Sequence, residues 1–333
     1  MMRPDETLAV HRQLIPEDQT RPRLGVALGS GGARGWAHIG VFRALKELGV
    51  EVDVYAGCSA GALVSGAALM GFYDEMIDWA KSIGPIGAIS SFGVHLSRGG
   101  LINPDKAFDI FRKHDKLIED LPKPWGCVAT DLSNGEEVWL TRGSAFEALR
   151  ATSAVPMVIQ AASYKALGEE HWLIDGAASN PVPVNLARAL GAERVIAVDL
   201  NAVTQALTRF KRPTTRAVVP VLHPPDEHTG FAAPVGTFLK NCQRGVTRRL
   251  ALAHARTMAR PQFFETAIAT VDILQAQLAE ARANLDVADV RLTPDLSLGS
   301  AAAFDKWEDF ERVGYETTMA SREKILAAAA FAR

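Results

Sequence analysis

From residue 23 onward, the sequence alternates short apolar and β-branched runs with stretches that have helical spacing. RLGVALG (23–29) has the composition of a strand, and a helical stretch with Val41, Leu45 and Leu48 on one face follows it. Strand–helix–strand repetition of this kind produces a mainly parallel sheet with helices on both faces. We therefore expect a three-layer α/β/α fold around a mainly parallel central sheet.

The same patterns give approximate bounds for each element. Strands are expected at 23–29, 51–57, 125–132, 136–142, 171–177, 193–200 and 288–296, and helices at 37–48, 60–70, 184–190, 236–259, 261–284 and 307–330. Ser-Asn-Gly separates the third and fourth strands and predicts a hairpin. Residues 1–22 are expected to form a flexible tail and residues 23–330 one domain, which includes a proline-rich excursion at 213–235 and a C-terminal helical region.

Composition excludes several classes of protein. A net charge of −2 over 333 residues gives no global attraction to nucleic acid. The three cysteines lie far apart without CxxC spacing, so neither a disulfide framework nor a metal site is expected. The first residues lack the apolar core of a secretion signal, and the most apolar stretch (56–72) is slightly short for a bilayer span. These features predict a cytoplasmic protein, or one held peripherally at the inner membrane surface.

Two segments are candidates for contact with lipid. The apolar segment 83–96 is expected to line an acyl channel or act as a lid, with ordinary loop packing as the alternative. Residues 201–260 carry an excess of Lys and Arg, and they form either a solvated face or a surface for anionic lipid headgroups.

GSGGARG (29–35), called the glycine loop below, follows the first expected strand. A dinucleotide fingerprint requires a glycine where this loop has Arg34, and a Walker A loop requires a Gly-Lys-Ser/Thr ending that is missing. Asp53 has the spacing of a ribose-binding acid, but it lies inside the second expected strand. Nucleotide binding is therefore a weak alternative.

GCSAG (57–61) has the G-x-S-x-G pattern between an expected strand and an expected helix. In a nucleophile elbow the serine occupies a turn so tight that only small neighbours fit, which accounts for Gly57 and Gly61. Ser59 is therefore the predicted nucleophile, and the helix N-terminus behind it favours developing negative charge. Cys58 is expected to be a small packing residue that points away from the exposed tip.

A serine nucleophile also needs oxyanion donors and a general base. Successive backbone N–H groups at Gly31, Gly32 and Ala33, next to a helix N-terminus, form a concavity suited to an oxyanion. The sequence alone leaves the base open among His38, His171, His223, His228 and His254, and among the strand-end aspartates Asp131, Asp175 and Asp199. Asp131 also suits a turn and Asp199 a cap.

Four blocks in this order resemble the motifs of the patatin-like phospholipases, nearest to the bacterial members close to the neuropathy-target-esterase catalytic domain. They are GSGGARG (29–35), GCSAG (57–61), ATSAVP (151–156) and DGA (175–177), and 97–113, 128–136 and 270–316 are also similar. The resemblance implies a patatin-like fold and a Ser59–Asp175 dyad without histidine. It also implies an oxyanion loop at Gly31, Gly32 and Ala33, with Arg34 holding the loop. DGA stands where many members have DGG, which leaves the aspartate in place.

The resemblance further implies a lipid acyl hydrolase that acts on glycerophospholipids or lysophospholipids, with triacylglycerol and simple esters as other substrates and with no cofactor. Without a membrane span, the protein is expected to reach a long-chain lipid by transient contact at a membrane surface or by extraction from micelles. Two alternatives remain: a serine acyltransferase of the malonyl-carrier type, which needs a histidine partner, and a non-catalytic lipid-binding protein. A histidine base predicts an inflection of the pH–rate profile near about 6–7, whereas an aspartate base is expected to give none.

Overall fold

The computed structural model describes residues 21–82, 108–156, 158–166, 169–201 and 263–330. The chain divides into two compact units, residues 1–206 with 272–333, and residues 207–271. The described residues of the second unit, 263–271, belong to helix α11 (Phe263–Leu285). The features discussed below lie in the first unit.

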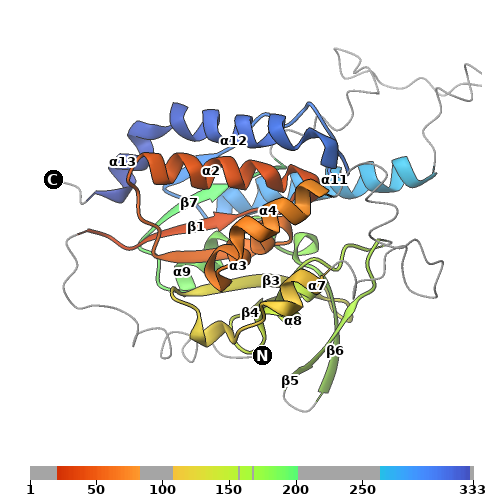
Figure 1. Cartoon of the computed structure of the whole chain (residues 1–333). Helices are drawn as coiled ribbons and strands as arrows, with labels where there is room; N and C mark the ends of the chain where they lie inside the picture. The colour runs from red at the N-terminus through yellow and green to blue at the C-terminus, as the bar shows by residue number, and fades with distance from the viewer. Residues whose placement is uncertain (1–20, 83–107, 157, 167–168, 202–262, 331–333) are drawn as a thin grey trace, which may run out of the picture. The chain divides into compact units, whose positions relative to one another are not determined.

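A mixed sheet forms the centre of this unit (Figure 1). Its strands are β1 (Leu24–Leu28), β2 (Val54–Cys58), β3 (Trp125–Asp131), β4 (Glu137–Leu140), β5 (Ala162–Ala166), β6 (Glu169–Asp175), β7 (Arg194–Val198) and β8 (Val290–Leu292). They are ordered β5–β6–β3–β2–β1–β7–β8, with β4 paired to β3 outside this path. β3, β2, β1, β7 and β8 are parallel, whereas the pairs β3–β4, β3–β6 and β5–β6 are antiparallel.

Helices cover both faces of the sheet. Their bounds are α2 (Trp36–Glu47), α3 (Ala60–Met70), α4 (Tyr73–Ser82), α7 (Asp109–Lys113), α8 (Ala145–Thr152), α9 (Val184–Ala189), α12 (Trp307–Ala320) and α13 (Arg322–Ala329). Successive residues of β1 belong to two different apolar clusters, because side chains along a strand point alternately to the two faces of the sheet. Val26 packs into the cluster that includes α2, α3, α8 and α12, and Ala27 into the one that includes α9 and α11. The predicted three-layer α/β/α fold is confirmed.

Most expected elements are present with bounds shifted by a few residues, and the 125–142 hairpin forms around Gly135, whose φ is +75°. The sequence patterns missed β5, α4, α7 and α8. The single helix expected at 307–330 is two helices, because the Ser321 backbone leaves the helical region between α12 and α13. The region 56–72 contains α3, which is buried inside the protein.

Several expectations fall outside the described residues: the tail (1–20), the apolar segment 83–96, the proline-rich excursion 213–235 and the helix at 236–259. Residues 202–260 of the basic stretch also lie outside the described residues, and so do His223, His228, His254 and Cys242. The single-domain boundaries 23–330 stay a prediction. None of the described helices combines the length and apolar character needed to cross a bilayer.

Helices α2 and α12, far apart in the sequence, lie side by side (Figure 1). Trp36 and Trp307 have ring centroids 5.7 Å apart, and Arg43 forms an ion pair with Glu311 at 2.7 Å. A Cβ on Gly40 would lie 1.9 Å from the Glu311 carbonyl oxygen, so the two backbones approach too closely for any side chain there. Helix α12 therefore packs directly on α2, the helix that follows the glycine loop.

Candidate active site

The register of the sheet brings Ser59 and Asp175 to the same level. Cys58 in β2 pairs with Val128 in β3, so the next residue, Ser59, is level with Ala129. Ala129 pairs on its other side with Asp175, the last residue of β6. Because β6 is antiparallel to β3, its end reaches the row at which β2 turns into α3. The structure thus brings together two residues that are 116 positions apart in the sequence.

Ser59 occupies a strained turn between β2 and α3. Its backbone has φ of 51° and ψ of −119°, and among the described residues it alone has a positive φ without being glycine. A positive φ in a residue with a Cβ is costly and is maintained only where the surroundings enforce it. The Ser59 N–H donates to Thr152 Oγ1 at 3.0 Å, and Thr152 Oγ1 donates to the Val128 carbonyl at 2.5 Å. This chain of two bonds fixes the turn to β3.

The glycines on either side of Ser59 allow close packing. A Cβ on Gly57 would lie 2.5 Å from Ala62 Cα, and a Cβ on Gly61 would lie 2.2 Å from the Leu28 carbonyl oxygen. Real Cβ atoms do not make contacts this short. α3 therefore approaches β1 and β2 more closely than any larger residue at these two positions would permit.

Asp175 is a buried carboxyl group with defined partners. Its Oδ1 accepts from the Ala177 N–H at 2.8 Å, and its own N–H donates to the Ala154 carbonyl at 3.0 Å. Burial raises the pKa of Asp175 from 3.8 to about 6, although the Ser59 hydroxyl and the Ala177 N–H lower it. The expectation that an aspartate base gives no inflection near pH 6–7 left out this desolvation, and a pKa near 6 argues against it.

Cys58 lies beside this carboxyl group. It is fully buried, as expected for a packing residue that points away from the exposed tip, and its Sγ is 3.9 Å from Asp175 Oδ1. Burial raises the pKa of the Cys58 thiol well above its usual range, with the Asp175 charge adding to this effect. A thiol held neutral in this way is a poor nucleophile. Cys127, on the neighbouring strand, is also a free, buried thiol.

The glycine loop follows β1 at the same edge of the sheet, since Leu28 pairs with Gly57. It continues into a 3₁₀ turn (Gly32–Gly35) that leads directly into α2. Gly32 has a φ of +56°, and a Cβ on it would lie 2.5 Å from the Ala301 carbonyl oxygen. The loop thus needs glycine at this position for both its conformation and its packing.

The N–H groups of the loop are not equivalent. The Ala33 N–H donates to the Ala301 carbonyl at 2.8 Å, and the Arg34 N–H to the Gly31 carbonyl at 3.1 Å. Within the described part of the chain, the N–H groups of Gly31 and Gly32 have no acceptor. Of the three predicted oxyanion donors, Ala33 is thus bonded within the protein, whereas Gly31 and Gly32 have no acceptor among the described residues.

The Arg34 side chain is buried and bonded within the protein. Its Nη2 lies 3.2 Å from Asp272 Oδ2, and its Nε donates to the Gly299 carbonyl at 3.3 Å. Burial raises the pKa of Asp272, and the Arg34 charge opposes this effect.

The other base candidates in the described residues have separate partners. His38 Nε2 lies 2.8 Å from the Gly29 carbonyl, an acceptor only, so this nitrogen carries the proton. Burial lowers the pKa of His38 to about 4. His171 Nδ1 lies 2.8 Å from Asp131 Oδ2, while Asp131 Oδ1 accepts from the Ser133 N–H in the expected turn. Asp199 Oδ1 caps the Asn201 N–H, and its Oδ2 pairs with Arg291 at 2.7 Å.

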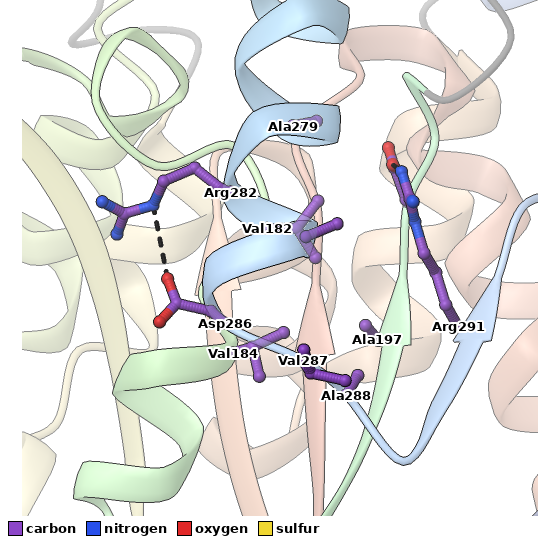
Figure 2. Close-up of a pocket in the computed structure, with 11 residues that line it drawn as sticks. Val182, Val184, Ala197, Ala279, Arg282, Asp286, Val287, Ala288 and Arg291 are labelled. Atoms are coloured by element: carbon purple, nitrogen blue, oxygen red, sulfur yellow. Dashed lines mark hydrogen bonds and ion pairs between the residues drawn. The ribbon is translucent and has the colours of Figure 1, made fainter.

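Asp199 also lines a pocket of about 130 Å³ on the face of the sheet that α9 and α11 cover (Figure 2). Its apolar wall comes from β7, α11 and the segment before α9, including Val182, Ala197 and Ala279. Its charged side chains are paired, Arg291 with Asp199 and Arg282 with Asp286. Ser59, Asp175 and the glycine loop do not line this pocket. Among the described residues, no cluster of His, Cys, Asp and Glu is arranged to hold a metal ion.

Sequence reasoning did not find two contributors to this site. Thr152 lies in ATSAVP, a block that we recognised only by its resemblance, and its bond to Ser59 spans 93 positions. Asp272 lies 238 positions from Arg34. No local pattern signals either contact, because both arise from packing between distant elements.

Comparisons with known proteins identify the family of this site. A family model described as patatin-like phospholipase matches residues 26–188. An uncharacterized NTE family protein of Mycobacterium tuberculosis is 39% identical over 198 residues, which are 59% of this chain and 54% of that protein. Mouse patatin-like phospholipase domain-containing protein 6 is 31% identical over 188 residues, which are 54% of this chain and 14% of that protein.

Among solved structures, VipD from Legionella pneumophila aligns with 56% of this chain and 53% of its own, at a TM-score of 0.34 and 12% identity. The chain spans about half the length of the mycobacterial relative that it matches. The range that the family model matches includes the whole glycine loop (29–35), the Ser59 turn and Asp175. Residues 26–188 therefore form a domain of the patatin-like phospholipase family.

Proposed function

We propose that this protein is a serine hydrolase that cleaves acyl ester bonds of lipids, with Ser59 as the nucleophile and Asp175 as the general base. The observation that carries the proposal is the Ser59 backbone, which holds a φ of 51° at the N-terminus of α3 beside a buried carboxyl group. Strain of this kind is concentrated at functional sites. The family match supports hydrolysis of a lipid, and the geometry supports these two residues as the ones that perform it.

The chemistry takes two steps. The Ser59 hydroxyl attacks the ester carbonyl carbon while Asp175 accepts its proton; the C–O ester bond then breaks, and the leaving alcohol takes that proton. Asp175 next removes a proton from water, which attacks the acyl-enzyme and releases the carboxylic acid, and Ser59 regains its proton. In both steps the negative oxygen accepts from the N–H groups of Gly31 and Gly32.

The substrate class we propose is a glycerophospholipid or lysophospholipid, with triacylglycerol and simple esters as further substrates. The protein would reach a long-chain lipid by transient contact with a membrane surface from the cytoplasm. The pKa of Asp175, raised to about 6 by burial, is compatible with a base that is ionised at neutral pH.

The test is hydrolysis of a p-nitrophenyl ester and of a lysophospholipid by the wild type, Ser59→Ala, Asp175→Asn and, as a control, Asp131→Asn. We expect the first two variants to lose about 1,000-fold or more in kcat, by analogy with other serine hydrolases. Asp131 ends a neighbouring strand without contacting Ser59, so Asp131→Asn should keep its kcat per folded molecule. Fluorophosphonate labelling should modify Ser59 in the wild type. Full activity of Asp175→Asn, combined with loss of activity in a histidine variant, would overturn the dyad and favour the acyltransferase-type alternative.

A further inference from the structure

The conformation of the glycine loop depends on contacts from the C-terminal part of the chain. The Ala301 carbonyl accepts from the Ala33 N–H, and the Gly299 carbonyl accepts from Arg34 Nε. Asp272, in α11, forms an ion pair with Arg34 Nη2 at 3.2 Å. Arg34 thus connects the loop to α11 and to the segment Gly299–Ala301 at once, and both partners lie outside residues 26–188.

The Arg34–Asp272 ion pair is buried, with side chains 4% and 8% exposed. Removing one partner of such a pair leaves the other charge unpaired in a poorly solvated position, which is strongly unfavourable. Without Asp272, the Arg34 guanidinium is expected to turn toward solvent and to release the Gly299 carbonyl. The effect would reach the loop directly, because Arg34 is part of it.

The contact with Ala301 determines which donors the loop presents. It occupies the Ala33 N–H, and the Ala301 carbonyl fills the space next to Gly32 that a Cβ would otherwise take. Gly31 and Gly32 remain with unoccupied N–H groups within the described chain. A shift of Gly299–Ala301 would therefore change both the number and the direction of the donors available to an oxyanion.

From these contacts we infer that Asp272 is a positioning residue of the oxyanion loop, which it holds in its active geometry through Arg34 and the segment Gly299–Ala301. The inference rests on the proposed function, because an oxyanion forms only if Ser59 attacks an ester. It extends the machinery of the reaction to residues beyond the patatin-like domain. It also gives the buried Arg34 a defined task that requires no contact with substrate.

The experiment compares Asp272→Asn and Asp272→Glu with the wild type and with Glu311→Gln. The control removes the charge of the Arg43–Glu311 ion pair, which also joins the family domain to the C-terminal part of the chain but does not touch the loop. For each protein, fluorophosphonate titration counts the active sites, and kcat and KM for a p-nitrophenyl ester are measured per active site. Inhibition by a trifluoromethyl ketone, which forms a tetrahedral oxyanion on serine, reports on the donors themselves.

We expect Asp272→Asn to lower kcat per active site roughly ten- to hundredfold, since loss of one oxyanion donor outright lowers it about 100- to 1,000-fold. KM should stay within about twofold, and the affinity for the trifluoromethyl ketone should fall by a factor similar to the fall in kcat. Asp272→Glu should recover part of the lost kcat because it keeps the carboxylate. Glu311→Gln should match the wild type per active site.

Two results would overturn the inference. In one, both Asp272 variants have fewer active sites that react with the fluorophosphonate, but a normal kcat at each of them, which is what a purely structural role predicts. In the other, kcat falls while affinity for the trifluoromethyl ketone is unchanged. Failure of the proposed function has a different signature: the wild type itself would neither react with the fluorophosphonate nor lose hydrolysis on Ser59→Ala.

Discussion

The Thr152 hydroxyl joins the Ser59 main chain to β3: it accepts from the Ser59 N–H at 3.0 Å and donates to the Val128 carbonyl at 2.5 Å. Thr152 is fully buried at the end of α8, so water cannot replace it. The strained φ of Ser59 is thus held from a helix that is remote in sequence. Thr152 never needs to approach the substrate for this task.

Thr152→Val should therefore impair the site while preserving the shape of the side chain. It leaves a buried donor and a buried acceptor unpaired, and we expect a loss of about 1–3 kcal/mol in the free energy of unfolding. We also expect the rate of fluorophosphonate labelling at Ser59 to fall roughly tenfold, as turn geometry is lost. Thr152→Ser keeps the hydroxyl that makes both bonds, so its labelling rate should be close to that of the wild type. Thr318→Val removes another buried hydroxyl, bonded to the Gly314 carbonyl in α12, and should leave the labelling rate unchanged.

If Asp175 is the base of the proposed reaction, its burial determines the pH dependence of hydrolysis. A base must be ionised, so kcat/KM should be constant above the Asp175 pKa of about 6 and fall about tenfold per pH unit below it. Because histidine titrates in the same range, the profile should be repeated at several temperatures. Ionisation of a carboxyl group has almost no enthalpy, whereas that of imidazolium has a substantial one. A midpoint that moves strongly with temperature would contradict Asp175 as the base.

Asp175→Asn should stabilise the protein at pH 8. The raised pKa means that the ionised form is disfavoured in the folded state, so wild-type stability falls as pH rises from 3.8 toward 6 and stays lower above it. Asparagine avoids this charge and keeps an oxygen for the Ala177 N–H. We expect a gain of roughly 1–3 kcal/mol in urea unfolding at pH 8 and none near pH 3.5.

Asp131→Asn is the control, because its stability at pH 8 is expected to change in the opposite direction. Bonds from Ser133 lower the pKa of Asp131, so its charge favours the folded state, and this variant should lose stability at pH 8. Similar stability changes in the two aspartate variants would contradict the buried, desolvated state of Asp175.

Gly61→Ala should prevent normal packing of the elbow. The new Cβ would lie 2.2 Å from the Leu28 carbonyl oxygen, a backbone atom that cannot move without displacing β1. We expect a loss of about 3 kcal/mol or more in stability, together with loss of fluorophosphonate labelling. Gly49→Ala, where the added Cβ meets nothing within 4 Å, should lose only about 1 kcal/mol from its positive φ of 66°. Thermal unfolding of both variants measures the difference.

The sequence was most informative where the signal is local. The apolar runs of β1 and β2 and the small residues of GCSAG depend on neighbours a few positions away, so both the parallel core and the tight strand–helix turn at Ser59 could be predicted. Asp175 could not be chosen from the residues alone, because its place depends on β6 pairing antiparallel with β3. Its raised pKa was missed for a related reason: burial is a property of the assembled site.

The contacts of the glycine loop show the same limit. The pattern of GSGGARG indicates a concavity of N–H groups, but the partner of the Ala33 N–H is Ala301, far along the chain. Which donors are free is therefore decided by a segment without any recognisable relation to the loop. Patterns within a motif predict its shape, and distant packing decides which of its groups remain available.

The packing of α12 on α2 has a consequence for how the chain folds during synthesis. α2 leaves the ribosome early, yet the surface around Trp36 and Gly40 packs against α12 (Trp307–Ala320), which is synthesised much later. Until α12 has been synthesised, the surface of α2 that α12 contacts lacks this partner. Nascent chains that stop before α12 should therefore depend on chaperones, and the packing around α2 should be completed only after α12 has been synthesised.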